Sequence, residues 1–489
     1  MSIFIVVNNP EDWPLQIHGA EVVAAKTYLS DPRFIDLRGV KVFNLSRSYR
    51  YQSLGYYVSL LAEARGHKPL PSVNTIQDMK SQTITRFVSD DLFELIQKNL
   101  APIRSEEFVL SIYFGRNLAR RYDRLSRSLF NLFPAPLLRA RFIRTRSWQL
   151  QSIGPIAASE IPDDHQAFVI EAASEYFAGK RSRRREPQAE RYDLAILHNP
   201  EEAQPPSDAA ALRRFVRAGR QLGFAVEMIT RNDYGRIAEF DALLIRETTG
   251  VNHHTYRFAR RAKAEGLVVI DDPGSILRCT NKVYLAELMQ RHRIPAPRTT
   301  IVNRGNMSAM AAGFALPCIL KQPDSAFSQG VIKVETRAEF LAQAARLLEK
   351  SELIIAQEFM PTAFDWRIGI FDRKAIFACR YYMVGGHWQI MQHGPEGRPR
   401  EGRAETVPLA QVPAHVVSTA LKAANLIGKG LYGVDIKEID GRVYVMEVND
   451  NPNIDHGIED AEGGNELYMT IMRGMLARVE ERKGERRPR

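Results

Sequence analysis

Residues 433–457, GVDIKEIDGRVYVMEVNDNPNIDHG, contain the pattern that decides the fold of this chain. Two strand-like runs flank Asp440-Gly441, a dipeptide typical of β-hairpin turns. Asp435 lies in the first run, and Glu447 and Asn449 lie in the second. Because Mg²⁺ prefers oxygen ligands and is often held by one or two carboxylates beside substrate phosphates, the stretch predicts a hairpin that holds a metal.

Side-chain alternation places a condition on the turn of this hairpin. With a two-residue turn, residue 439 pairs with 442, and Asp435 and Glu447 fall on opposite faces of the sheet. A three-residue loop, 439–441, places both carboxylates and Asn449 on one face. We therefore predict the three-residue loop; the alternative is a solvated sheet face without a metal. On the core face we expect Tyr444, Met446 and Val448.

Composition indicates a folded protein of several domains. The 489 residues exceed what one hydrophobic core serves, and 45% of them are apolar. No apolar run is long enough to cross a membrane, and the start lacks a basic signal-peptide segment, so we expect a cytoplasmic protein. The three cysteines form no CxxC pair. The net charge of +10 favours acidic partners such as nucleotides or RNA without choosing among them.

Strand and helix patterns divide the chain into α/β and α+β parts. Strands alternate with helices after Tyr192, which favours a parallel sheet with helices on its faces. Beyond residue 275 the pattern changes to a small α+β part followed by a larger sheet. The expected parts are an N-terminal α/β domain (1–180), a basic linker (181–190), a parallel α/β domain (191–274), two further subdomains (275–360 and 361–480) and a basic tail (481–489).

Residues 116–146 contain nine arginines and one acid. Leu118, Tyr122, Leu125 and Leu129 recur at helical spacing, which predicts a helix packed on the core with a solvated basic face. The alternative is a surface that binds an anionic substrate or RNA.

Two lysines are candidates for binding phosphate groups. Lys321 lies in an apolar strand just before SAFSQG (325–330), and Lys282 lies at the start of a helix. A strand lysine beside a flexible loop can neutralise nucleotide phosphates while loop amides close over them. The lysines would otherwise be ordinary surface residues.

The stretch AQEFMPTAFDWRIGI provides further candidates. Glu358 ends a strand and can meet a ribose hydroxyl. Asp365 and Arg367 occupy alternate positions of the next strand and so share a face. We expect Arg367, with Arg380 on the following strand, to bind a phosphate or carboxylate.

Two features of the sequence do not indicate a ligand-binding site. GKGLYG (428–433) follows a helix and precedes a strand, the reverse of the dinucleotide-binding order. The pair His253-His254, together with His387 and His393, shows no metal-ligand spacing and predicts surface or core residues.

Four motifs together resemble the ATP-grasp superfamily, and most of all its RimK-type carboxylate–amine ligases, which are related to glutathione synthetase. They are NKVYLAELMQRHRIPAPRT, LPCILKQPDSAFSQGV, QEFM with DWR, and GVDIKEIDGRVYVMEVNDNPN, within about residues 190–475. The first 180 residues resemble the extra N-terminal domain of some RimK-like ATP-grasp proteins. The resemblance implies an ATP-grasp fold: a pre-ATP-grasp α/β domain, a lid subdomain and a C-terminal antiparallel sheet.

The resemblance also implies roles for matching residues. Asp435, Glu447 and Asn449 would hold two Mg²⁺ (or Mn²⁺) ions on ATP. The residues expected to bind the nucleotide are Lys282, Lys321, Ser325, Ser328, Gly330, Gln357, Glu358, Phe359, Met360 and Asp365; Arg367 and Arg380 are the expected catalytic residues.

The chain departs from the RimK-type pattern in one strand. Where those ligases have an Arg-x-Asn, this chain has His387-Trp388-Gln389. The segment between the expected adenine and ribose hinge (residues 357–360) and Asp365 is also shorter than in those ligases. The candidates for the missing phosphate contact are Arg380, Arg398 and Arg403.

The substrate residues follow from the expected parallel sheet. Ligands bind at the carboxyl ends of such strands, so we expect Arg246 to bind a substrate carboxylate; its alternative is a solvent-paired arginine. Asn451 and Asn453 would line the same cleft, and Asp455 or His456 could act as a base.

The implied reaction phosphorylates a carboxylate with ATP, after which an amine displaces phosphate to form an amide. The expected substrates are an amino acid or peptide amine and a carboxylate acceptor, and a homo-oligomer is expected by resemblance. The alternatives are an ATP-grasp kinase and an RNA- or ribosome-associated regulator directed by the basic N-terminal region. Nucleic acid is the less favoured partner, and no membrane partner is expected.

Overall fold

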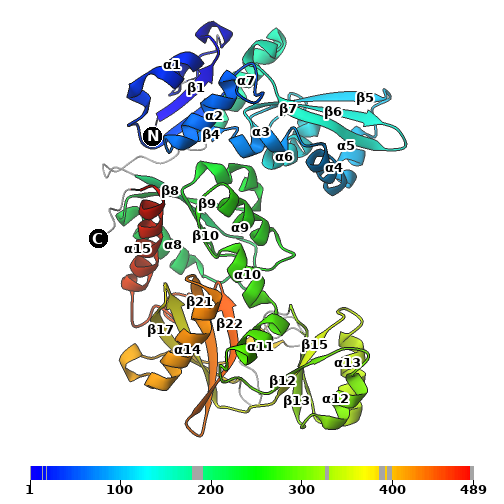
Figure 1. Ribbon diagram of the computed structural model, residues 1–489, viewed down its shortest axis with the longest axis vertical. Coiled ribbons are helices and arrows are strands. Elements are labelled where there is room, and N and C mark those ends of the chain that lie inside the picture. The colour runs from blue at the N-terminus through cyan, green and yellow to red at the C-terminus, as the bar shows by residue number, and fades with distance from the viewer. Residues whose placement is uncertain are drawn as a thin grey trace. The chain divides into compact units, whose positions relative to one another are not determined.

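The computed structural model describes residues 2–13, 15–17, 19–178, 191–324, 330–384, 391–393 and 399–484 (Figure 1). The chain forms two compact units. The N-terminal unit comprises Met1–Asp193 and Asn232–Asp241, and the C-terminal unit comprises Leu194–Arg231 and Ala242–Arg489. Within the described ranges, no helix combines the length and apolar character needed to cross a membrane.

The N-terminal unit contains a parallel sheet and an antiparallel sheet. The parallel sheet has the order β2-β1-β3-β4, and its apolar strands are buried against α1 and α2. The antiparallel sheet has the order β5-β6-β7. The strands are β1 (Ser2–Val7), β2 (Glu21–Ala24), β3 (Val40–Asn44), β4 (Lys68–Leu70), β5 (Glu107–Tyr113), β6 (Leu137–Arg144) and β7 (Trp148–Pro155). The helices are α1 (Ala25–Ser30), α2 (Leu54–Ala64), α3 (Val73–Asp78), α4 (Gln82–Asp91), α5 (Phe93–Leu100), α6 (Asp123–Leu132) and α7 (Gln166–Ala178).

The arginine-rich stretch forms a shorter helix than its periodicity predicted. Helix α6 begins at Asp123, and residues 137–144 form strand β6. Tyr122, Leu125 and Leu129 are buried in the core as predicted, whereas Leu118 is 42% exposed. The periodic pattern is therefore a core stripe over one helix, and Leu118 precedes it.

Buried ion pairs fix residues 232–241 within the N-terminal unit. Lys41 Nζ lies 3.0 Å from Glu239 Oε2, and Lys68 Nζ lies 3.0 Å from both Asp193 Oδ2 and Asp241 Oδ2. This segment falls inside the range 191–274 that sequence patterns assigned to the next domain. The difference arises because these contacts join residues far apart in the sequence.

The C-terminal unit begins with a four-stranded sheet of order β11-β10-β8-β9, in which β10 pairs in parallel with β8 and β11. The C-terminal helix packs beside α8 (Figure 1), with the rings of Phe215 and Tyr468 4.8 Å apart. The strands are β8 (Tyr192–Leu197), β9 (Phe224–Ile229), β10 (Ala242–Ile245) and β11 (Val268–Ile270). The helices are α8 (Ala209–Gln221), α9 (His254–Ala264), α10 (Pro273–Thr280), α11 (Lys282–Arg291) and the C-terminal α15 (Asn465–Arg482).

An antiparallel sheet of order β12-β15-β13-β14 follows, with α12 and α13 sharing its apolar core. Its elements are β12 (Thr299–Val302), α12 (Met307–Gly313), β13 (Cys318–Lys321), β14 (Val331–Val334), α13 (Arg337–Leu347) and β15 (Ile354–Glu358).

The third sheet of this unit is antiparallel, with the order β20-β17-β16-β21-β22. Helix α14 covers one face, where its alanines and Val416 join the apolar strand residues in one core. The opposite face carries the polar residues of the candidate site. The elements are β16 (Phe364–Phe371), β17 (Lys374–Tyr382), β18 (Met391–His393), β19 (Pro399–Glu401), β20 (Ala404–Thr406), α14 (Ala414–Ile427), β21 (Leu431–Ile439) and β22 (Arg442–Asp450).

The hairpin β21–β22 has a two-residue turn, so the predicted three-residue loop is wrong. Ile439 pairs with Arg442, and Asp440 and Gly441 both have positive φ, 49° and 72°. A register shift then occurs: Ile436 pairs with Val445, but Asp435 pairs with Glu447. The extra residue is Met446, which forms a β-bulge.

This bulge produces the shared face by a different route. It reverses the alternation beyond Met446, so that Glu447 and Asn449 join Asp435. The core face carries Val443, Val445 and Val448. The prediction for Val448 is confirmed, but Tyr444 and Met446 are only partly buried and lie outside that core.

Candidate active site

A row of charged side chains crosses the exposed face of the third sheet. Arg367 pairs with Asp435, and Asp435 pairs with Glu447, on three adjacent strands. The Arg367 guanidinium donates two hydrogen bonds to the Asp435 carboxylate, both 2.7 Å long. Asn449 Nδ2 donates to Asp435 Oδ2 at 3.1 Å. The three predicted metal ligands therefore lie together.

Lys282 and Lys321 approach this row from neighbouring elements. Lys282 Nζ lies 2.9 Å from Glu447 Oε1, and Lys321 Nζ donates to Gln357 Oε1 at 2.7 Å. Burial by itself would raise the pKa of Glu447, but Lys282 and Lys321 together lower it. Burial lowers the pKa of Lys321 to about 8. A buried lysine whose partner is neutral is suited to an anionic ligand.

Lys437 belongs to the same face, although the sequence analysis missed it. Its Nζ lies 2.5 Å from Asp365 Oδ1 and donates to Thr362 Oγ1 at 2.7 Å. Lys437 follows Asp435 by two residues on one strand, so alternation alone could have identified it. Asp365 is thus held by Lys437, and burial raises the pKa of its carboxyl group.

These groups line one cavity of about 640 Å³. That volume lies within the range usual for small-molecule sites. The predicted residues that line it are Lys282, Lys321, Gln357, Glu358, Phe359, Met360, Asp365, Arg367, Asp435, Glu447, Asn449, Asn451 and Asn453. Tyr381, Lys437, Met446 and Glu459 also line the cavity and were not predicted.

The structure describes the predicted adenine hinge, residues 357–360, and only Gly330 of the loop 325–330 that was expected to close over the phosphates. Gln357 and Glu358 end β15, and the Glu358 side chain is exposed. Gly330 has φ 68°, a conformation that favours glycine, and precedes β14. Ser325 and Ser328 lie outside the described residues, as do His387, Trp388, Gln389 and Arg398.

Arg380 does not join the site, contrary to the prediction. It pairs with Trp366, whereas Cys379 pairs with Arg367, so Arg380 occupies the opposite face. Its guanidinium lies 4.7 Å from the centre of the Trp366 ring and 5.1 Å from that of Phe364. A register shift between Gly369 and Ile370 is the cause, because it reverses the alternation beyond it.

The site face instead carries Tyr381. Its hydroxyl group donates to Glu459, and its ring lies 4.9 Å from the Arg367 guanidinium carbon. Arg403, another candidate for the missing phosphate contact, is exposed and lies 6.0 Å from the Tyr382 ring.

Arg246 is a buried structural contact and is unsuited to binding substrate. It is 1% exposed, and it does not line the cavity. Its guanidinium donates to Ser207 Oγ at 3.0 Å, Asn451 Oδ1 at 2.7 Å, Pro452 O at 2.9 Å and Pro206 O. Residues 248–253, which follow β10, do line the cavity. Arg246 itself, however, is hydrogen-bonded to the loop after β22.

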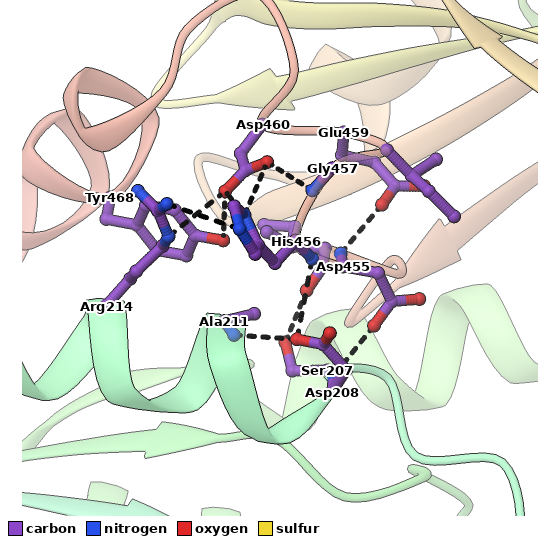
Figure 2. Close-up of polar contacts among 12 residues, drawn as sticks. Ser207, Asp208, Ala211, Arg214, Asp455, His456, Gly457, Glu459, Asp460 and Tyr468 are labelled. Atoms are coloured by element: carbon purple, nitrogen blue, oxygen red, sulfur yellow. Dashed lines mark hydrogen bonds and ion pairs between the residues drawn. The ribbon is translucent and has the colours of Figure 1, made fainter.

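The same loop is tied to the start of α8, as Figure 2 shows. Asp208 N donates to Asp455 Oδ1 at 2.7 Å, and Ser207 Oγ donates to Ile454 O at 2.8 Å. His456 Nδ1 lies 3.0 Å from Asp460 Oδ2, and His456 does not line the cavity. Of the two predicted bases, Asp455 alone lines the cavity.

The donor set of this cavity fits Mg²⁺ and a polyphosphate. Asp435, Glu447 and Asn449 offer oxygen ligands on one face, which suits a hard cation. Lys282 and Lys321 lie beside them; Lys282 is buried and Lys321 is partly buried. The RimK-like ATP-grasp model that matches this part of the chain and the ligase names of its relatives give the class: the chain is an ATP-grasp ligase.

Two parts of the chain match family models of RimK-like ATP-grasp proteins. Residues 279–466 match the family model of the RimK-like ATP-grasp domain, and residues 25–172 match that of the RimK-like ATP-grasp N-terminal domain.

Named relatives match about half of this chain. A "Probable alpha-L-glutamate ligase" of a Marinomonas species is 26% identical over 282 residues, which is 53% of this chain and 89% of the relative. A "Probable alpha-L-glutamate ligase 2" of Shewanella denitrificans is 28% identical over 259 residues, 51% of this chain and 81% of the relative. The crystal structure of a RimK domain ATP-grasp protein from Sphaerobacter thermophilus has a TM-score of 0.45 and 15% identity, and the match covers 57% of this chain and 98% of that one.

Proposed function

We propose that this protein forms an amide bond between a carboxylate and an amine through an acyl phosphate, with two Mg²⁺ ions on ATP. The observation that carries the proposal is one cavity that is lined by three oxygen ligands and by two lysines, one buried and one partly buried. ATP and a carboxylate substrate are both anionic and repel each other. Cations and basic side chains must offset this repulsion before phosphoryl transfer can occur.

The side chains divide into three roles. Asp435, Glu447 and Asn449 hold the metal ions, and Lys282 and Lys321 neutralise phosphate oxygens. Lys282 is paired with Glu447 in this structure, so it would exchange that carboxylate for a phosphate oxygen when MgATP binds.

The remaining roles are the contacts to adenine and ribose and the base that accepts the amine proton. Residues 357–360 offer backbone groups to adenine, and the exposed Glu358 carboxylate accepts from the ribose hydroxyls. Arg367 orients the Asp435 carboxylate through its two hydrogen bonds. Asp455 lines the cavity and is the candidate acceptor of the amine proton.

The reaction balances in two steps. The carboxylate oxygen attacks the γ-phosphorus of ATP, which releases ADP and forms an acyl phosphate. The amine nitrogen then attacks the acyl carbon, the C–O bond to phosphate breaks, and the amine loses a proton. Because acyl phosphates hydrolyse in water, the cavity must close during turnover, and residues 325–330 are the proposed lid.

The names of the relatives suggest the first substrates to test. Both relatives are named as glutamate ligases, so we propose that an amino acid is one substrate and that glutamate is the first candidate. The acceptor is proposed to be a small molecule or peptide.

The experiment combines ATP, Mg²⁺, pooled amino acids and short peptides with the purified chain, and follows amide products by mass spectrometry. We expect an amide, with ADP and phosphate released only when both substrates are present. A phosphorylated product without an amide would indicate a kinase and contradict the proposal.

Two variants separate the metal site from the fold. Glu447→Gln should remain folded and lose MgATP-dependent turnover, because it removes one of the two carboxylate charges that hold Mg²⁺. Glu438→Gln is the matched control on the same hairpin: Glu438 accepts from Trp366 on the opposite face, and we expect turnover to persist. Full activity of Glu447→Gln would remove Glu447 from the metal site.

A further inference from the structure

Another group of metal-ligating side chains lies at the carboxyl end of the parallel sheet, apart from Asp435 and Glu447. Glu247 follows β10, and His253 and His254 lie at the start of α9. One ligand atom from each of these three residues lies within 4.8 Å of the other two. The spacing of His253 and His254 in the sequence did not predict a metal site, because the third candidate ligand, Glu247, comes close to them only in the folded chain.

Glu247 is a buried carboxylate, and burial is costly for a charged group. It is 2% exposed, and its Oε2 has no hydrogen-bond partner among the residues that the structure describes. A buried carboxylate oxygen without a partner carries a large desolvation cost, which a cation would offset. Glu202 adds a neighbouring carboxylate, because it accepts the backbone N–H of Thr248, the residue after Glu247.

The two imidazoles face this carboxylate. His254 Nε2 lies 2.8 Å from Glu247 Oε1, yet within the described part of the chain this nitrogen makes no hydrogen bond of acceptable geometry. The rings of His253 and His254 have centroids 4.0 Å apart. His253 Nδ1 lies 2.9 Å from Thr255 Oγ1, a contact that orients the ring, and His253 lines the cavity.

We propose that Glu247, His253 and His254 bind one divalent transition-metal ion of the zinc type. Two imidazoles and one carboxylate favour Zn²⁺, Co²⁺ or Ni²⁺ over Mg²⁺, which prefers oxygen ligands alone. Three protein ligands leave a coordination position for water or substrate. Because His253 lines the cavity, the ion lies at the wall of the proposed active site and is separate from the Mg²⁺ ligands.

The test measures Zn²⁺ binding to the full chain, free of any affinity tag, by equilibrium dialysis in excess Mg²⁺. Excess Mg²⁺ occupies the oxygen-ligand site, so retained Zn²⁺ reports the imidazole site. Titration with Co²⁺ gives a second readout, since its visible absorption reports the coordination geometry. We expect one ion per chain.

Three variants remove one ligand each: Glu247→Gln, His253→Ala and His254→Ala. Each should weaken Zn²⁺ binding by about tenfold to a hundredfold or more, since even losses beyond the direct ligands cost that much. His415→Ala is the matched control, because the exposed His415 lies 3.0 Å from Glu438 and, among the residues that the structure describes, belongs to no group of three possible metal ligands. Its Zn²⁺ affinity should equal that of the parent.

Two outcomes would overturn the proposal. One is a parent protein that retains no Zn²⁺ against Mg²⁺, and the other is parental affinity in His253→Ala and His254→Ala. If the buried Glu247→Gln variant fails to fold, as judged by circular dichroism, the partly exposed histidine variants decide the question. Binding is measured without ATP and should persist in Glu447→Gln, so this proposal can fail while the ligase proposal stands, and the reverse.

Discussion

Replacing Arg246 by alanine should destabilise the C-terminal unit. The guanidinium is 1% exposed and donates to four acceptors, two of them on the loop after β22. In Arg246→Ala these acceptors, which include Asn451 Oδ1 and Pro452 O, lose their donor inside the protein. Removing one partner from a buried charged network costs about 3–5 kcal/mol.

The melting temperature follows from this free energy. A change of 1 kcal/mol shifts the melting temperature by about 2–4 °C in a domain of 150–250 residues, so we expect a decrease of about 6–20 °C. Arg246→Lys should fall between the parent and Arg246→Ala, because an ammonium group keeps the charge but cannot reproduce the planar fork of donors.

Thermal unfolding followed by circular dichroism, with and without MgATP, is the assay. The transition that MgATP shifts identifies the C-terminal unit, because a ligand stabilises the state that binds it. Arg442→Ala is the control, since Arg442 is an exposed arginine on β22. If Arg246→Ala melts within about a degree of the parent, Arg246 is not the structural contact described here.

Four further predictions concern the cavity and the sheet face opposite it. Lys321→Ala should weaken ATP binding by about tenfold to a hundredfold in calorimetry, because one charge-assisted contact is lost; unchanged affinity would exclude Lys321 from the site. Because burial lowers the pKa of Lys321 to about 8, its ammonium group loses a proton as the pH rises through that value, so ATP affinity should fall there, and Lys321→Arg should abolish this dependence. Lys437→Met leaves Asp365 buried without its cation, which should cost about 3–5 kcal/mol in urea unfolding; a parental midpoint would contradict the pairing. Arg380→Lys should keep the KM for ATP, since Arg380 lies on the opposite face, and a large rise in KM would return it to the site.

Local sequence patterns were sufficient for most elements of the C-terminal unit. Alternation and apolar runs predicted the strands β13, β16, β21 and β22, and the helices α11 and α14. The oxygen ligands Asp435 and Glu447 were identified because carboxylates are costly in an apolar strand without a function. The expected roles of these residues remain predictions.

Two β-bulges account for the errors at the site. Each hairpin has a two-residue turn and one extra residue in a strand, Met446 in β22 and Ile376 in β17. In the first hairpin the bulge brings Glu447 onto the face of Asp435. In the second, the bulge carries Arg380 away from the face of Arg367.

The sequence by itself determined which residues form strands and helices and which side chains can bind a metal or a phosphate. These properties depend on residues close together in the chain, through backbone preference and the period of burial. Tertiary structure alone decided which side chains share a face across strands, that Arg246 is occupied by the loop near Asn451, and that Glu247 meets His253 and His254. One extra residue in a ladder reverses every side chain beyond it, and its position depends on packing between distant strands, which a local pattern does not contain.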